Sequence, residues 1–285
     1  IGLGVEDVVR LADGSARPVP GTDAMKRVTE SWDAARRIAA TGRVYGRSTG
    51  VGANRNEPVP TEAAAGHGLR LLRSHAGAIG DELPARQVRA MLAVRANQLL
   101  AGGAGLRPTV VTALCEALAN GAYPVVNEFG SVGTGDIAAL AQVGLALAGE
   151  HPWRPAGDGS GAPAAQPLDN NDALAFISSN ALTLGQSALA LHELRALVEA
   201  TQVVAALSLL AVDGSHEAYA APVHAARPHR GSAEVARRMR WRMVSAWDSE
   251  VSAAGAAPFS LSMASICFWR SATDWSRRFR RSSFQ

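Results

Sequence analysis

Apolar residues recur at helical spacing through most of this chain. The clearest stretch runs from Val88 to Leu99, where apolar side chains return every three or four residues. Pro84 suits the first turn of a helix, and Gly102-Gly103 suits its end. The pattern therefore predicts an amphipathic helix between these two signals.

Three further segments have helical spacing, and few segments resemble strands. Val44-Tyr45 and Val125-Val126 are the strand candidates, and both are too short to build a principal sheet. We predict an all-α fold, an elongated bundle of long helices with a small mixed N-terminal loop region. The further helices are expected at 110–119, at 137–148, which is apolar nearly all round, and at 173–212 as one or two long buried helices.

Composition shifts along the chain suggest three regions. A Gly- and Pro-rich segment, 152–167, reads as a surface loop between two apolar helices. The last part of the chain differs from the rest, because nine Arg and four of the six Trp lie from Arg237 onward. A nucleic-acid-binding tail and a divergent or frame-altered terminus are both open interpretations. The expected regions are 1–150 with a lid loop and a Gly-rich turn, 168–250 as a central helical bundle, and 251–285 as a divergent tail.

The composition narrows the class of protein. With 285 residues, 47% of them apolar, the chain can form one large core or two modest ones. Its two cysteines, Cys115 and Cys267, cannot make a disulfide framework, and the charge-free stretch 173–191 holds several polar side chains unsuited to a bilayer. All but one of the 28 basic residues are Arg, which indicates codon bias rather than nucleic-acid binding. We expect a cytoplasmic protein without nucleic-acid or membrane partners.

The segment GSVGTGDIAALAQ at 130–142 carries the most chemical information. Three glycines in six residues permit positive φ angles and close backbone approach, and Asp136 stands where its carboxylate would cap the following helix. A plain helix-capping loop or a phosphate cradle would also use glycines here. However, this segment lacks the Gly-Lys-Ser/Thr sequence of a phosphate-binding loop. It also lacks the preceding strand that a dinucleotide-binding motif requires.

Four motifs in order give this turn a context. VYGRSTGVG stands at 44–52, LLRSHAGAIG at 71–80 and VRAMLAVRANQLLAGGAGLR at 88–107, followed by the segment at 130–142. In order and separation they resemble the histidine, phenylalanine and tyrosine ammonia-lyases and aminomutases. RPHRGSAEVARRMR from Arg227 extends a resemblance that covers roughly residues 1 to 250.

The resemblance implies removal of ammonia from an aromatic amino acid, which needs both a base and an electrophile. The family cyclises its own Ala-Ser-Gly into methylidene-imidazolone (MIO). This chain has one residue fewer and places Gly133-Thr134-Gly135 directly before Asp136. Either these residues cyclise into a methyl-substituted MIO-type group, or no ring forms and the pocket lacks its electrophile. Cyclisation with dehydration would remove two waters from the mass.

Tyr45 matches the family's catalytic tyrosine, so the resemblance implies that it is the base. Gly46, Gly50 and Gly52 around it suit a mobile lid that closes over substrate, with Gly52 among the substrate-binding candidates. His75 matches a position that recognises the substrate side chain, and its Ser-His context is similar to the histidine-specific version. A histidine that caps the end of a helix is the alternative interpretation.

The chain departs from the family pattern at other positions. Where the family has Asn-Gly in contact with the electrophile, this chain has Ser178-Ser179, and Asn180 could substitute after a shift in register. The family segment that supplies a second tyrosine and a carboxylate-binding arginine is echoed only at 257–262. There Phe259 lacks a hydroxyl and Ser262 lacks a guanidinium. Ser178, Asn180 and Phe259 join the substrate-binding candidates.

Two main hypotheses follow. The first is an ammonia-lyase-like biosynthetic enzyme that acts on a free or carrier-bound aromatic or histidine-like amino acid, by elimination or by a related addition or isomerisation. The second is a catalytically silent homologue retained for binding or assembly, and a truncated product with a non-native tail is a further alternative. The resemblance implies a homotetramer, consistent with helices too apolar to face water. No metal ligands are expected.

Overall fold

The computed structural model describes residues 2–155 and 161–253. It is mostly helical, with 61% helix against 6% strand, which confirms the predicted all-α class. The chain divides into two compact units, Ile1–Ala196 and Leu197–Gln285. The expected regions with limits at 150, 168 and 251 stay predictions. The calls on residues 254–285, including Phe259, lie outside the described residues.

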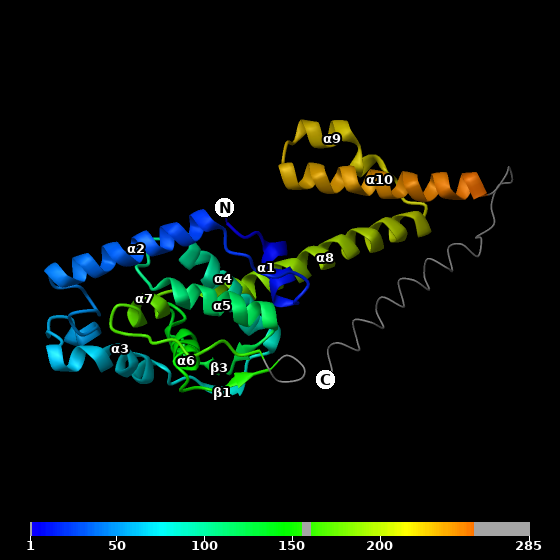
Figure 1. Ribbon diagram of the computed structural model, residues 1–285. Coiled ribbons are helices and arrows are strands. Elements are labelled where there is room, and N and C mark those ends of the chain that lie inside the picture. Colours follow the sequence, from blue (N-terminus) through cyan, green and yellow to red (C-terminus); the bar gives the residue numbers. More distant parts are fainter. Residues whose placement is uncertain (1, 156–160, 254–285) are drawn as a thin grey trace. The chain divides into compact units, whose positions relative to one another are not determined.

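The first unit is a helical layer packed around one central helix (Figure 1). Helix α4 contacts α1, α2 and α5, while α6 contacts α3 and α7. Helix α8 begins in this unit. The bounds are α1 Val5–Ala12, α2 Thr22–Thr41, η1 Gly52–Asn54, α3 Thr61–His75, α4 Ala85–Leu100, α5 Pro108–Asn120, α6 Ile137–Leu147, α7 Ala173–Ile177 and α8 Ala181–Ala211.

Helix α4 forms as its apolar spacing predicts. Val88, Met91 and Leu92 are fully buried, and burial of side chains of this size stabilises the fold by about 1.5–3 kcal/mol each. Pro84 is the N-cap and not a first-turn residue, because its ψ of 142° is extended. The helix ends before Gly102, whose φ of +85° turns the chain out of the helical path.

Helix α6 confirms the expectation of an element that is apolar all round. Every residue from Ala138 to Leu147 is buried. Gly144 permits close packing, because a Cβ at this position would lie 2.9 Å from Leu72 of α3. The helix is therefore enclosed by the first unit, and the turn that precedes it is fixed at one end.

In the described part of the chain, strand structure is limited to two short antiparallel pairs. Strand β1 (Ile79–Glu82) pairs with β3 (Asn127–Phe129), and β2 (Tyr123–Pro124) pairs with β4 (Trp153–Arg154). The strand predictions were wrong in position. Val44-Tyr45 enters a turn instead, and Val125-Val126 connects β2 to β3 with single bonds to Pro152 and Leu83.

The segment 173–212 forms two helices, as one of the two predicted outcomes. Ser178-Ser179-Asn180 separates α7 from α8. Their predicted burial holds for α7 but is wrong for α8, most of which is exposed within this chain. The exposed apolar residues of α8 are Leu184, Leu191, Leu194, Leu197, Val198 and Val204.

By length and composition alone, Ala173–Ala211 would be sufficient to cross a membrane, and it is the single such stretch in the described part of the chain. Its mean hydropathy is 1.5. Apolar helices of protein cores and subunit interfaces meet the same criterion, so this finding is weak evidence for a membrane span.

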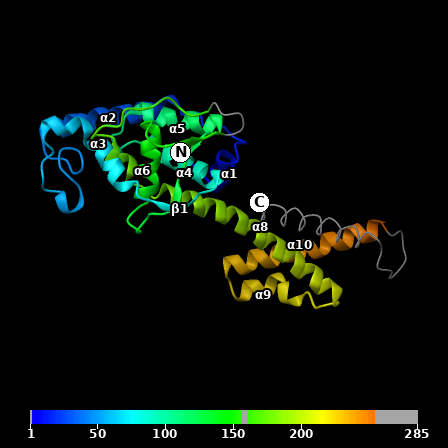
Figure 2. The same cartoon turned by 90° about the horizontal axis from the view of Figure 1, so that it is seen from below.

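The second unit contains the remainder of α8, η2 (Glu217–Tyr219), α9 (Ala221–Ala226) and α10 (Arg230–Ala253). Figure 2 shows α9 alongside α10, in agreement with their contacts. Ala206, Met239 and Met243 form its small buried cluster. This core is much smaller than that of the first unit, which holds most of the predicted site residues.

Candidate functional site

Residues 42–60 form a closed loop that carries Tyr45. A β-bridge joins Thr49 to Pro58, and the Gly50 N–H donates to the Glu57 carbonyl at 3.0 Å. The Tyr45 side chain is 53% exposed, and its hydroxyl accepts a hydrogen bond from the Gly52 N–H at 3.0 Å. The structure thus brings two predicted site residues together, with the phenol at the surface.

The Gly-rich turn is held by a bond across its ends. The Ser131 hydroxyl donates to the Gly135 carbonyl at 2.7 Å. Gly133 and Gly135 have φ angles of +94° and +135°, which other residues rarely adopt. Gly133 and Thr134 are exposed, whereas Gly135 is buried. The glycines are therefore required by the backbone of this turn.

Asp136 has a different role from the one predicted. Its side chain makes no capping bond to α6, although it occupies the N-cap position. The carboxylate instead accepts two bonds from Thr183 in the first turn of α8, one from its N–H and one from its hydroxyl, both at 2.8 Å. Asp136 is 3% exposed, and its own N–H donates to the Ser179 carbonyl at 2.8 Å. It therefore joins the starts of two helices.

Of the residues before α8, Ser179 and Asn180 both approach the Gly-rich turn. A Cβ built on Gly135 would lie 3.4 Å from the Ser179 carbonyl and 3.6 Å from the Asn180 amide oxygen. The Ser178 hydroxyl donates to Leu174 within α7 instead. This arrangement agrees with the shifted register considered for Asn180, whose role stays a prediction.

Gln98 was missed by the sequence reasoning although it contacts this region. Its amide oxygen accepts from the Ser179 hydroxyl at 2.6 Å and from the Arg95 guanidinium at 3.0 Å. Arg95 is buried and also donates to the Phe176 carbonyl, and desolvation lowers its pKa to about 10. The adjacent asparagine and glutamine inside the 88–107 motif are the sequence signal that could have pointed to Gln98.

His75 lies at the C-terminal end of α3, where its ring is already bonded. Nδ1 is 2.8 Å from the Leu71 carbonyl and 3.0 Å from the Ser74 hydroxyl. Because a carbonyl only accepts, Nδ1 must carry the hydrogen, and Nε2 is the nitrogen left for another partner. The helix-end interpretation describes this bonding, and it leaves one ring nitrogen for recognition.

Asn127 of β3 is paired with Gln142 of α6. The Gln142 amide donates to the Asn127 side-chain oxygen at 2.8 Å and accepts from its backbone N–H at 2.9 Å. Gln142 is 3% exposed. This pair fixes β3 to α6, directly before the Gly-rich turn.

A charge network with one fully buried carboxylate, that of Asp172, lies beside the Tyr45 loop. Arg107 donates to the Asp172 carboxylate at 2.6 Å and to Asp169 at 2.8 Å. Asp172 is fully buried, and this desolvation raises its pKa against the opposing effect of Arg107. Desolvation likewise lowers the pKa of Arg47, although both carboxylates favour its charge. These four charges balance in sign.

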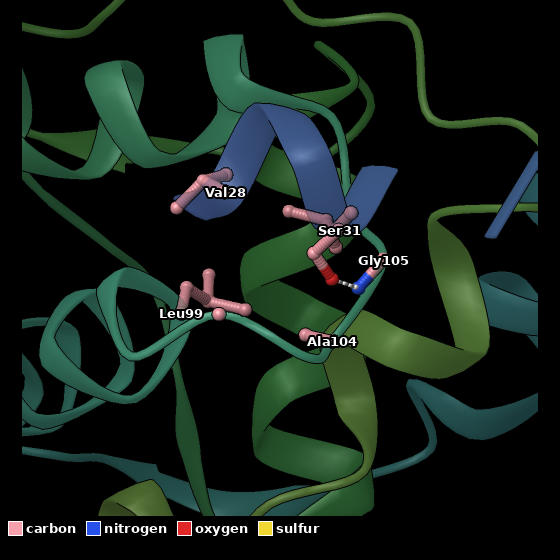
Figure 3. A pocket seen from close by; sticks show the side chains of 7 residues that line it. Val28, Ser31, Leu99, Ala104 and Gly105 are labelled. Carbon is pink, nitrogen blue, oxygen red and sulfur yellow. Dashed lines mark hydrogen bonds between the residues drawn. The ribbon is translucent and has the colours of Figure 1, made fainter. Parts of the chain in front are cut away.

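Two hollows of the surface lie away from the predicted site residues. A cavity of about 240 Å³ lies between α1, α4 and α5, with Leu11, Arg17 and Leu118 among its lining residues. Figure 3 shows a crevice near α2, too narrow for a ligand, in which the Ser31 hydroxyl accepts from the Gly105 N–H at 3.0 Å. No predicted site residue lines either one.

Within the described chain, no hydrogen bond connects Tyr45 to the turn at 133–135. The same residues contain no group of three His, Cys, Asp or Glu arranged for a metal ion. Among the described residues of one chain, the lid loop and the Gly-rich turn are therefore not joined to each other by a hydrogen bond of Tyr45.

Comparison with known proteins identifies the class. A family model described as aromatic amino acid lyase matches residues 3–257. The chain belongs to the aromatic amino acid lyase family, which confirms the resemblance drawn from its motifs. It is 34% identical to the histidine ammonia-lyase of Streptomyces griseus over 253 residues, covering 84% of this chain and 48% of that protein. It is 32% identical to the tyrosine ammonia-lyase of Cupriavidus metallidurans, covering 82% and 46%.

Solved structures agree with this family. Ergothionase from Treponema denticola matches with a TM-score of 0.78 and 29% identity, covering 84% of this chain and 50% of that one. Tyrosine aminomutase from Streptomyces globisporus matches with a TM-score of 0.76 and 25% identity, covering 91% and 53%. The chain spans about half the length of the curated relatives that it matches.

The family uses an MIO group formed from its own chain. The residues at 133–135 do not fit the serine-derived form of that group, because threonine replaces serine and the turn is one residue shorter. The Ser131 bond to the Gly135 carbonyl closes this shorter turn on itself, with Thr134 exposed. We therefore derive no catalytic step through MIO.

Proposed function

We propose that this chain is part of an ammonia-lyase-like enzyme that acts on an aromatic or histidine-like amino acid, with an altered or absent MIO electrophile. The reaction is elimination of ammonia or a related addition or isomerisation. The observation that carries the proposal is the loop in which the Gly52 N–H holds the exposed Tyr45 hydroxyl. The match of this family over most of the chain supports it.

Tyr45 acts as the base in this proposal. In its phenolate form the oxygen accepts the β-proton of the substrate, the electrons of that C–H bond form the carbon-carbon double bond, and the protonated amine leaves as ammonia with the electrons of the C–N bond. The products are ammonia and an α,β-unsaturated acid. The N–H of Gly52 orients the oxygen that receives the proton.

His75 supports recognition of a polar ring, because its Nε2 is the nitrogen not used by the Leu71 carbonyl. A carrier-bound amino acid offers the same ring to His75.

A catalytically silent homologue is the second candidate, and the altered turn favours it. Loss of the serine from the triad removes the side chain that forms the family's alkene. The intact mass of the purified protein shows whether this turn is cyclised or unmodified. We expect the unmodified mass, and a mass lower by two waters would show that Gly133-Thr134-Gly135 cyclises.

We also propose that a second copy of the chain covers α8, as part of a homo-oligomer such as a tetramer. Leu191, Leu194 and Leu197 are 40%, 53% and 57% exposed. Apolar side chains in such a row are stabilised by burial against another helix. Light scattering is expected to give a mass above that of one chain. A monomer that persists at high protein concentration would contradict this assembly.

The catalytic proposal is tested by incubating the purified protein with histidine, phenylalanine and tyrosine in turn. Formation of an unsaturated acid from at least one of them is expected as a rise in ultraviolet absorbance. Alanine is the matched control, because it has the same reacting backbone and no ring. Absence of product from all three, together with an unmodified mass, would support the silent homologue.

A further inference from the structure

Arg47 connects the Tyr45 loop to the body of the first unit. Its guanidinium Nη2 donates to the carbonyls of Ala104 and Gly105 at 3.2 and 3.1 Å. These residues lie between α4 and α5, and the Gly105 N–H is itself bonded to Ser31 of α2 (Figure 3). One side chain therefore connects the loop to a segment fixed by three helices.

The backbone of the same residue is held from another direction. The Asn170 amide donates to the Arg47 carbonyl at 2.8 Å, and the Arg47 N–H donates to the Val44 carbonyl at 3.0 Å. Gly46 lies against α7, because a Cβ at this position would come within 2.1 Å of the Leu174 side chain. The chain is thus held immediately after Tyr45.

Stability alone does not account for this arginine. Its Nη1 is buried and has no hydrogen-bond partner among the described residues, and desolvation lowers the pKa of the group. A buried charge with an unused donor works against folding. Arg43, at the same distance on the other side of Tyr45, is exposed and donates to the Asn56 carbonyl within the loop itself.

We infer that Arg47 is a positioning residue, which fixes the Tyr45 hydroxyl in the orientation needed to receive the β-proton of the substrate. This inference rests on the proposed function, since it assigns the base to Tyr45. Arg47 acts through the loop and does not contact the substrate. Because a small misplacement of a reacting group is costly, loss of the tether should lower kcat by roughly tenfold to a hundredfold.

The test compares Arg47→Met, Arg47→Lys and the control Arg43→Met. Arg47→Met should lower kcat with little change in KM, and Arg47→Lys should restore part of kcat because it keeps a charged donor. Arg43→Met should leave both unchanged. A rise in KM alone for Arg47→Met would mean that Arg47 binds the substrate, and this would overturn the positioning role.

Hydrogen exchange of the Gly52 amide supplies a second readout that needs no turnover. This amide donates to the Tyr45 hydroxyl, so its exchange rate reports whether the phenol is in place. Arg47→Met should raise the rate about tenfold, toward that of Tyr45→Phe, while Arg43→Met should not. An unchanged rate in Arg47→Met would overturn the inference. If no variant turns over substrate, the proposed function fails, and the exchange rates still decide the role of Arg47.

Discussion

Replacing Asp136 by alanine tests how the Gly-rich turn is joined to α8. The carboxylate accepts from the N–H and the hydroxyl of Thr183, both at 2.8 Å, in a site where Asp136 is 3% exposed. Asp136→Ala leaves two donors without their partner, one of them a backbone N–H in the first turn of a helix. A lost capping residue costs about 1 kcal/mol, and a hydrogen bond to a charged group contributes about 1.5–3 kcal/mol. We therefore expect a loss of about 2–4 kcal/mol.

Urea unfolding followed by circular dichroism measures this change in the free energy of unfolding. Asp136→Asn is the closest variant, because it keeps an acceptor for the Thr183 N–H and loses only the charge, so its loss should be smaller. Asp13→Ala is the matched control. Asp13 also lies at a helix end, but its bond to Arg86 is exposed, and such pairs contribute at most about 1 kcal/mol.

A double-mutant cycle with Thr183→Val isolates the interaction between the two side chains. The loss in Asp136→Ala/Thr183→Val should be smaller than the sum of the two single losses, because both remove the same hydroxyl bond. An Asp136→Ala variant within about 0.5 kcal/mol of the parent protein would refute the reasoning, since surface changes without a specific mechanism fall in that range.

Two further predictions concern ionisable groups that are buried or partly buried. Arg107→Met leaves the fully buried Asp172 without its guanidinium, so it should cost about 3–5 kcal/mol in urea unfolding, and adding Asp172→Asn should recover part of that loss. Burial lowers the pKa of His67 below its ordinary 6.5, with a smaller effect of Arg70 in the same direction. The unfolded chain therefore binds a proton at His67 more readily than the folded chain does. The contribution of neutral His67 to folding stability is present above pH 6.5 and is lost as the pH falls from there through the folded-state pKa. When the pH is lowered from 7.5, the free energy of unfolding should fall less in His67→Gln than in the parent protein. An equal fall in the two proteins would contradict this assignment.

The sequence predicts the helices of the core because their burial is encoded locally. Val88, Met91 and Leu92 lie on the pattern that gives α4, and all three are fully buried. The continuous apolar run from Ala138 to Leu147 likewise gives α6, which is buried all round. The end of α4 is also encoded locally, since Gly102 ends this helix with a positive φ.

The contacts of the candidate site depend on partners far apart in the chain. Asp136 bonds to Thr183, 47 residues away, and nothing in the local sequence separates this from a cap on its own helix. Arg47 reaches Ala104 and Gly105 across 57 and 58 residues. Spacing gives the residue types at such positions, but tertiary packing decides which of them meet. The exposure of α8 has a similar cause, because its apolar pattern predicts burial without stating which chain provides it.

The role of Tyr45 in proton transfer is tested most directly by Tyr45→Phe, which removes the hydroxyl and keeps the ring. With the amino acid that the parent protein converts, we expect formation of the unsaturated acid to fall below detection in Tyr45→Phe. The urea midpoint should stay close to the parent value, because this residue is 53% exposed and its one hydrogen bond among the described residues is to Gly52. Turnover at the parent rate in Tyr45→Phe would contradict the account.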